Sequence, residues 1–369
     1  MTNPLVALGQ LGQSPWYDFI TRDLVRSGEL ARLIREDGLM GMTSNPTIFE
    51  KAIAGSSDYD ADIRRLTGEG KSAAEVFEAL AVADVQAACD LFRSVWDARK
   101  NGDGTVSLEV SPTLAHDTAG TIAEAQRLWD RVARPNVMIK IPGTTAGLPA
   151  ITECLARGIN VNVTLLFAVE RHREVIEAFF QGLERRVAAG QPADRLCSVA
   201  SFFVSRVDGK IDPMLDKGGE GAAKVRGTVA IANAAAAYGA FEAAFRGPRW
   251  DALAQFGAQR QRPLWASTST KDPKYPDTYY VEALVAAHTV NTLPPDTFAA
   301  YRDHGHPAAR IAAHVHGAES MLAQLGQFGV DLAAVTAFLE TDGVQKFAAS
   351  YQSLLAGIEA KAGSLAGSA

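Results

Sequence analysis

The chain has 369 residues, 47% of them hydrophobic and 21% charged, which is the composition of an ordinary globular protein. A formal net charge of -6 argues against a nucleic-acid-binding surface, so an anionic ligand would need a local cationic site. No apolar stretch approaches the ~18 residues of a membrane span, and we expect no signal peptide. The three widely spaced cysteines fit free thiols, so we expect a cytoplasmic protein without membrane association.

Eight short apolar segments alternate along the chain with longer helical patterns. The expected strands are residues 15–19, 39–43, 106–110, 137–141, 159–166, 197–203, 263–267 and 288–293. The clearest helical patterns, rich in Ala, Leu, Glu and Arg, cover residues 73–99, 118–134, 169–189 and 224–245. This alternation predicts a parallel sheet covered on both faces, and eight repeats are the number in a closed (β/α)8 TIM barrel. A doubly wound open sheet is the main alternative, but no G-x-G-x-x-G follows a strand.

Three segments interrupt the regular spacing and predict extra helices. Residues 46–70 form a short helical excursion after the second strand, and residues 295–329 lie beyond the eighth strand. A final helical pattern at 333–361 carries apolar residues with which we expect it to pack across the barrel, and residues 364–369 are expected to fray. Because there is no low-complexity linker, the sequence predicts one domain over residues 1–369.

Lys140 is a lone charged residue inside the apolar segment Val137-Met138-Ile139-Lys140-Ile141, which ends at a Pro-Gly breaker. Removing an ammonium from water costs several kcal/mol unless it is paired or loses its proton. A lysine retained at such a place is a candidate amine nucleophile that forms a Schiff base with a carbonyl substrate. The alternative is a strand-end lysine that reaches solvent, and this segment alone does not decide between the two.

Polar residues stand at or near the carboxyl end of every expected strand, where barrel enzymes place their active sites. In chain order they are Asp18, Thr43-Ser44-Asn45, Glu109, Lys140, Asn162 with Thr164, Ser201, Ser267 and Asn291. Any single member has a simpler explanation as a helix cap or a turn. The occurrence of the whole set around one lysine indicates imine chemistry on a carbonyl compound.

At these residues the chain resembles transaldolases, over nearly its whole length. It is closest to the longer bacterial form, which has the N-terminal pattern Ser14-Pro15-Trp16-Tyr17-Asp18. The other matching motifs are GMTSNPTIFEK at 41–51, SLEV at 107–110, IKIPGT at 139–144, NVNVTLLF at 160–167, SFFVSR at 201–206 and WASTSTK at 265–271. Several motifs in the same order make the resemblance specific.

The resemblance implies a role for each catalytic group. Lys140 would form the Schiff base with a ketose phosphate, and the protonated imine would act as the electron sink for cleavage between C3 and C4. Asp18 would take the proton of the C4 hydroxyl. Glu109 and Thr164 would hold a catalytic water during imine formation and hydrolysis.

The resemblance also implies the binding groups. Asn45, Asn162 and Ser201 would hold the three-carbon dihydroxyacetone fragment until an aldose acceptor arrives. Arg206 would bind the substrate phosphate, because its fork geometry suits phosphate oxygens, with Ser267 as a second contact.

The phosphate site departs from the family pattern at one position. Shorter transaldolases place a second arginine two residues after the serine that Ser267 matches, where this chain has Ser269. We expect Lys271 to supply the missing charge.

The implied reaction moves dihydroxyacetone from sedoheptulose 7-phosphate to glyceraldehyde 3-phosphate, giving erythrose 4-phosphate and fructose 6-phosphate in the pentose phosphate pathway. Because the lysine provides the electrophile, we expect no cofactor and no metal. The expected partners are sugar phosphates, with neither nucleic acid nor membrane, and the protein is expected to be a monomer or a homodimer.

Three alternatives remain open at this stage. A fructose 6-phosphate aldolase shares the fold and the lysine, but such enzymes tend to carry Gln at the position of Glu109 and Tyr at that of Phe203. A metal-dependent hydrolase is suggested by His304, His306, His314 and His316, with His288 nearby, although we expect residues 301–317 to form a loop leading into a helix. A catalytically inactive sugar-phosphate-binding barrel is disfavoured because every catalytic position is filled.

Overall fold

The computed structural model describes residues 3–98 and 102–366. Eight parallel strands pair in sequence order and close into a barrel, which confirms the predicted (β/α)8 architecture. The strands are β1 (Gln13–Asp18), β2 (Gly41–Thr43), β3 (Thr105–Glu109), β4 (Val137–Pro142), β5 (Val161–Leu166), β6 (Ser198–Phe203), β7 (Arg262–Ala266) and β8 (Thr289–Leu293). No boundary differs from the expected one by more than two residues.

The barrel strands are buried on both faces, which explains their nearly continuous apolar sequences. Every residue of β4, β5 and β6 is buried, including the charged Lys140. The register aligns Glu109 with Lys140 and Lys140 with Asn162, so these three side chains point to the same side of the sheet. That side is the barrel interior.

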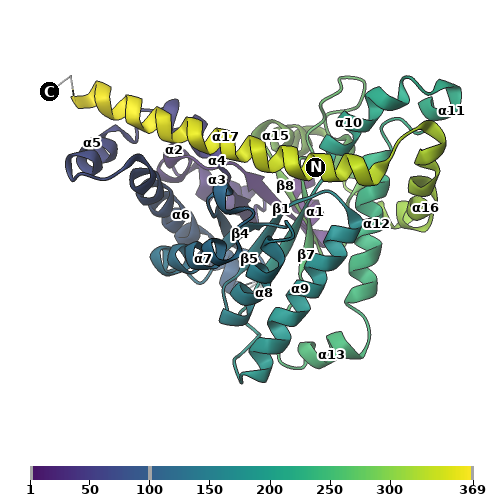
Figure 1. Ribbon diagram of the computed structural model, residues 1–369, viewed down its shortest axis with the longest axis horizontal. Coiled ribbons are helices and arrows are strands. Elements are labelled where there is room, and N and C mark those ends of the chain that lie inside the picture. Colours follow the sequence, from purple (N-terminus) through teal and green to yellow (C-terminus); the bar gives the residue numbers. More distant parts are fainter. Residues whose placement is uncertain (1–2, 99–101, 367–369) are drawn as a thin grey trace.

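Helices surround the barrel (Figure 1). The helices between successive strands are α2 (Arg22–Arg26), α3 (Glu29–Glu36), α4 (Pro46–Ala54), α5 (Asp60–Gly68), α6 (Ala73–Ala98), α7 (Thr118–Val132), α8 (Gly147–Arg157), α9 (Val169–Ala188), α10 (Ser205–Leu215), α11 (Gly219–Ala223), α12 (Val229–Ala244), α13 (Pro248–Ala254) and α14 (Tyr279–Ala283). Outside this series lie α1 (Pro4–Gln10), α15 (Pro295–His304), α16 (Ile311–Ala323) and α17 (Leu332–Ala366).

One of the four expected helical patterns differs from the prediction. The helix expected at 224–245 begins only at Val229, because Gly227 has a positive φ of 75° and a Cβ there would lie 2.6 Å from the ring of Tyr275. Arg99, the expected end of the helix 73–99, lies outside the described residues. The other three patterns are confirmed within two residues at each described end.

The three insertions fold as helices. Residues 46–70 contain two helices, α4 and α5, rather than one excursion. The expected loop leading into a helix at 301–317 is confirmed from residue 305 onward, since residues 305–310 precede α16 at Ile311, but it was wrong for residues 301–304, which continue α15. The expected frayed tail was wrong for residues 364–366, which continue α17, and residues 367–369 lie outside the described part.

The C-terminal helix α17 packs across the barrel, as predicted. Figure 1 shows it as one long helix along the whole upper side of the molecule, while α13, which precedes β7, lies at the opposite end. It contacts α4, α5, α6, α10 and β5, all near the carboxyl ends of the strands. Gly343 permits its close approach to the barrel, because a Cβ there would lie 3.0 Å from the side chain of Leu165.

Within the described ranges, no single helix is long and apolar enough to cross a membrane. The segments Ile311–Phe328 and Leu332–Ala366 meet the length and composition criterion only as a pair bent by 95°. All three cysteines are buried and carry free thiols, as expected.

Candidate active site

A cavity of about 250 Å³ lies at the carboxyl ends of the strands, and we call it the mouth cavity. It is lined by residues from seven strand ends, all except that of β3, and by Phe347 of α17. Nine of the residues predicted from the sequence line it, namely Asp18, Asn45, Lys140, Thr164, Ser201, Phe203, Arg206, Ser267 and Lys271.

Lys140 is buried at the inner end of the mouth cavity, with 5% of its side chain exposed. Its Nζ lies 3.4 Å from Oε2 of Glu109 and donates a hydrogen bond of 3.2 Å to the carbonyl oxygen of Ser44. The ring of Phe347 from α17 covers the amine at 5.7 Å. The amine is therefore held inside the barrel beside a carboxylate and does not reach bulk solvent.

Glu109 forms the other half of this buried pair, with 3% of its side chain exposed. Burial raises the pKa of its carboxyl group to about 7, although the Lys140 ammonium opposes that shift. Among the described residues, neither Glu109 oxygen nor the hydroxyl of Thr164 has a hydrogen-bond partner of normal geometry. These polar atoms are therefore free to bind a substrate or a water molecule. Glu109 itself does not line the mouth cavity.

Asp18 lies across the mouth from this pair. Its Oδ1 accepts a 2.6 Å hydrogen bond from Thr43, whose hydroxyl is also 2.6 Å from that of Thr292. Burial raises the pKa of the Asp18 carboxyl group, while the Lys140 ammonium and the Thr43 hydrogen bond act to lower it. The hydroxyl pair orients the carboxylate.

Asn291 does not line the mouth, contrary to its predicted place among the strand-end polar residues. Its Oδ1 accepts a hydrogen bond of 2.9 Å from Thr268, and Thr292 faces the cavity instead. Successive residues of a strand point to opposite faces, so only one of these neighbours can face the barrel interior.

Asn162 and Ser201 form a buried polar chain beneath the cavity. Ser201 donates to Oδ1 of Asn162 at 2.7 Å, and Nδ2 of Asn162 donates to the hydroxyl of Ser107 at 2.9 Å. Ser201 lines the mouth cavity, whereas Asn162 is fully buried and does not. Asn162 is placed to orient Ser201.

A cationic end of the cavity is formed by the residues after β6 and β7. The guanidinium of Arg206 stacks 5.1 Å above the ring of Phe203, and burial lowers its pKa. Ser267 has a positive φ of 56°, an uncommon conformation for a residue with a side chain. Lys271 donates a hydrogen bond of 2.9 Å to Ser269, and both residues line the cavity.

Several further residues line the cavity without having been predicted, among them Lys51, Ile48 and Phe347. Lys51 and Ile48 lie inside the 41–51 motif. Their spacing from Asn45 on a helix could have indicated that they share the face that lines the cavity. Phe347 comes from α17, and its apolar side chain gave only a packing signal.

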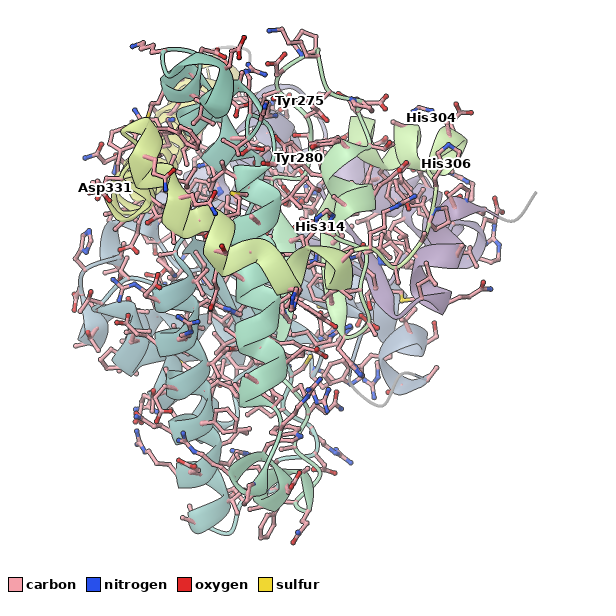
Figure 2. All side chains as sticks on the ribbon, turned by 90° about the vertical axis from the view of Figure 1, so that its right-hand side faces the viewer. Tyr275, Tyr280, His304, His306, His314 and Asp331 are labelled. Atoms are coloured by element: carbon pink, nitrogen blue, oxygen red, sulfur yellow. The ribbon has the colours of Figure 1, made fainter. Side chains whose placement is uncertain are left out.

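The histidines that suggested a metal site lie away from this cavity. Figure 2 labels His304, His306 and His314, the last of which lies on α16, and these three residues line a separate pocket. His304 is hydrogen-bonded to Asp277 at 2.9 Å and to Asp303 at 3.1 Å. In the part of the chain that the structure describes, no three His, Cys, Asp or Glu side chains are grouped as metal ligands.

A parallel barrel with a buried lysine at its mouth is typical of enzymes that activate a carbonyl substrate through an amine. The chain belongs to the transaldolase/fructose-6-phosphate aldolase family, whose model matches residues 15–358.

Several curated relatives are similar over almost the full length. The transaldolase of Acidothermus cellulolyticus is 52% identical, covering 97% of this chain and 96% of its own. The transaldolase of Frankia alni is 51% identical, covering 98% of both chains. Transaldolase 2 of Nostoc sp. is 46% identical, covering 97% of both chains.

Proposed function

We infer that this protein is a transaldolase, which transfers dihydroxyacetone from sedoheptulose 7-phosphate to glyceraldehyde 3-phosphate. The products are erythrose 4-phosphate and fructose 6-phosphate, in the pentose phosphate pathway. The observation that carries this conclusion is the Lys140 amine, which is buried at the mouth cavity 3.4 Å from the Glu109 carboxylate. Family membership and the names of the relatives support the same reaction.

The first step is attack of the Lys140 amine on the C2 carbonyl of the ketose phosphate. The resulting carbinolamine loses its oxygen as water, and the iminium that remains is the electron sink for bond cleavage. Glu109 and Thr164 relay protons through a water molecule in this step and in the later hydrolysis. The buried and otherwise unbonded polar atoms of both residues support this role.

Asp18 acts as the base that removes the C4 hydroxyl proton when the C3–C4 bond breaks. Burial raises the pKa of this carboxyl group toward neutral pH. A group whose pKa is closer to the working pH can both accept and return a proton more easily. Asn45 and Ser201 hold the three-carbon fragment, with Asn162 orienting Ser201 from below. The fragment stays bound to Lys140 until the acceptor aldehyde arrives.

The substrate phosphate binds at the cationic end of the mouth. Arg206 provides the main contact, Ser267 a hydroxyl, and Lys271 the second positive charge. Phe203 supports the guanidinium of Arg206 from below.

The aldolase alternative is not favoured. Glu109 and Phe203 are the residue types found in the transferases, and relatives about 50% identical carry the name transaldolase. Incubation with fructose 6-phosphate alone should release less than one free dihydroxyacetone per enzyme molecule. Multiple turnovers without an acceptor would instead identify an aldolase.

We place the protein in the cytoplasm as a single-domain monomer or homodimer that acts on sugar phosphates. Neither a metal nor an organic cofactor takes part in the steps above, because the lysine iminium supplies the electrophile.

Borohydride trapping tests the assignment. Reduction in the presence of fructose 6-phosphate should attach a three- or six-carbon adduct to Lys140, located by peptide mass spectrometry. Lys140→Met should give no adduct and no activity, whereas Lys51→Met, which changes another lysine of the mouth cavity, should retain the adduct. An adduct on a different lysine, or none in the parent protein, would refute the mechanism.

A further inference from the structure

A second cavity, of about 610 Å³, lies beside the barrel between α6, α7, α17 and the turn Pro112–Leu114. We call it the lateral cavity. Its outer end is lined by exposed residues such as Ala74, Thr113 and Gln352. Its inner end is lined by buried Ser44 and Leu108 and by Glu109, whose side chain is almost fully buried. The lateral cavity therefore extends from the surface to the wall of the barrel.

The Lys140 amine lies at the boundary between the two cavities. Lys140 lines the mouth cavity, but its two nearest polar partners, Ser44 and Glu109, line only the lateral cavity. Asn45 lines both cavities. One layer of side chains thus separates the reacting amine from a second space.

Imine chemistry requires one water molecule to leave the amine and another to reach it later. Formation of the iminium from a ketone and the amine breaks the C2–O bond and, with one proton taken up, releases that oxygen as one water molecule. Hydrolysis of the product iminium consumes one water molecule and restores the C2 carbonyl and the amine. At both moments a phosphorylated sugar, anchored at Arg206, occupies the mouth cavity between the amine and its opening.

We propose that the lateral cavity is the route by which this water leaves and enters the site, with Glu109 as its inner gate. The proposal rests on the function proposed above. The two buried carboxylate oxygens of Glu109 without hydrogen-bond partners among the described residues suit a transient water contact.

The charges at the outer end argue against a second sugar-phosphate site. Arg127 and Arg131 are both paired with Glu78, and Arg127 also lies 3.9 Å from Glu124. Because each cation already faces a carboxylate, no free positive charge is left there to attract a phosphate. Phe77 and Tyr351 make the remaining wall aromatic. The hydroxyl groups of Ser111 and Thr113 and the carboxyl group of Glu109 also line the cavity and can hydrogen-bond to water.

Oxygen exchange measures the route directly. The parent enzyme, incubated with fructose 6-phosphate in H₂¹⁸O without an acceptor, should incorporate ¹⁸O at C2 faster than the Lys140→Met variant. Ala81→Leu should fill the lateral cavity from the buried face of α6. Thr113→Phe should obstruct its outer end from an exposed position, where misfolding is less of a risk.

Both filling variants should slow the oxygen exchange and lower kcat by about tenfold. Because the substrate-binding residues are unchanged, KM for fructose 6-phosphate should stay the same. The matched control is Ala236→Leu, which fills a separate cavity between α9, α12 and α17 and should leave exchange at the parent rate. Thermal melts check that each variant is folded.

Unchanged exchange in folded Ala81→Leu and Thr113→Phe, with the Lys140 adduct still trapped in the parent, would overturn the water route while leaving the proposed function intact. Absence of the adduct in the parent would overturn the function itself. Equal slowing in Ala236→Leu would also overturn the route, because the effect would then be a general one of overfilling.

Discussion

At the scale of the residue, the ionisation of Glu109 should give the pH dependence of activity an acid limb. Burial raises its pKa to about 7, above the ordinary value of 4.5, so the carboxyl group is protonated below about pH 7 and ionised above it. A proton acceptor is competent only when ionised. We therefore expect kcat/KM, which reports the free enzyme, to rise with pH up to about 7 and then level off.

The variant Glu109→Gln should lose this acid limb and lower kcat/KM by about 100-fold or more, the usual contribution of a general base. The measurement is the pH profile of kcat/KM with fructose 6-phosphate and erythrose 4-phosphate. Glu124→Gln is the control, because burial also raises the pKa of Glu124 but that residue accepts a backbone hydrogen bond from Ser111 outside the mouth. A limb near pH 7 that persists in Glu109→Gln would assign it to another group.

Lys271 should contribute to phosphate binding and not to the chemical step. It lines the mouth cavity and is hydrogen-bonded to Ser269, but it is exposed, so a contact worth about 1 kcal/mol is expected. Lys271→Ala should therefore raise KM for phosphorylated sugars about fivefold with little change in kcat.

Steady-state kinetics with fructose 6-phosphate as donor test the role of Lys271. Lys274→Ala removes an exposed lysine from the same loop that does not line the mouth cavity, and it should leave KM unchanged. If both variants shift KM equally, general surface charge is the cause, and an unchanged KM in Lys271→Ala removes that lysine from the site.

The sequence located the site residues best where a strand end carried one distinctive side chain. Lys140 and Glu109 are such cases, because a charge in an apolar strand has few structural uses. The prediction of Asn291 at the mouth was wrong, and its neighbour Thr292 lies there instead. Both residues are polar, and a shift of one residue along a strand moves a side chain from the interior face of the barrel to the exterior face. Phe347 could not be found at all, since its place over the amine depends on how α17 crosses the barrel.

Among the elements, α10 is tied to α14 and to the loop between β7 and α14 by acid–tyrosine hydrogen bonds. Tyr280 donates to Asp208 at 3.0 Å, and Tyr275 donates to Asp212 at 2.9 Å. Figure 2 shows the two tyrosines on the same side of the molecule. Arg226 strengthens the link through an ion pair of 2.7 Å with Asp272. Since α10 carries Arg206 and the loop carries Lys271, this network sets the spacing of the two proposed phosphate ligands.

Tyr275→Phe should therefore weaken phosphate binding without touching the substrate. The substitution removes two hydrogen bonds, one donated to Asp212 and one accepted from Arg226, each worth about 1 kcal/mol. It should raise KM for fructose 6-phosphate at least about fivefold while kcat changes little. The kcat/KM with unphosphorylated fructose as donor should stay the same, which a merely structural defect would not allow. Tyr238→Phe, which removes a hydrogen bond to Ala287 before β8, should leave both parameters unchanged. A parallel fall of kcat/KM for both donors would contradict the positioning role.

The alternation of strands and helices could be predicted from the periodicity of apolar residues, but some helix boundaries could not. The helices α6, α7 and α9 have polar outer faces and were found within two residues. The late start of α12 depends on Gly227 meeting the ring of Tyr275, a contact 48 residues away in sequence that no local pattern contains. Likewise α12 is apolar on most faces because α16 covers it, a fact of tertiary structure.

At the scale of the whole molecule, the two ends of the barrel have different tasks. The carboxyl ends of the strands hold the unpaired and titratable groups described above. Near the amino ends, Asp103 accepts hydrogen bonds from Ser14 at 2.9 Å, from the Trp16 indole at 3.1 Å and from Arg262 at 2.9 Å. This cluster joins β1, β7 and the segment before β3, so every polar atom in it serves closure of the barrel.

Asp103→Ala should consequently destabilise the fold and spare the chemistry. The substitution leaves the Trp16 indole without its acceptor and the largely buried Arg262 guanidinium without its carboxylate, although Arg262 keeps Ser14 and the Gly102 carbonyl as acceptors. Loss of the buried ion pair costs about 3–5 kcal/mol. Urea denaturation at pH 7.5 measures this loss, and kinetics at a temperature where the variant is folded should return the parent kcat and KM.

The exposed Asp130 offers the control, because among the residues that the structure describes it accepts side-chain hydrogen bonds from Gln126 alone, on the same helix. Asp130→Ala should change the unfolding free energy by no more than about 0.5 kcal/mol. If Asp103→Ala instead lowered kcat in the folded protein, the amino end of the barrel would be coupled to Lys140 through the strands. The division between a stabilising end and a reacting end would then not hold for this barrel.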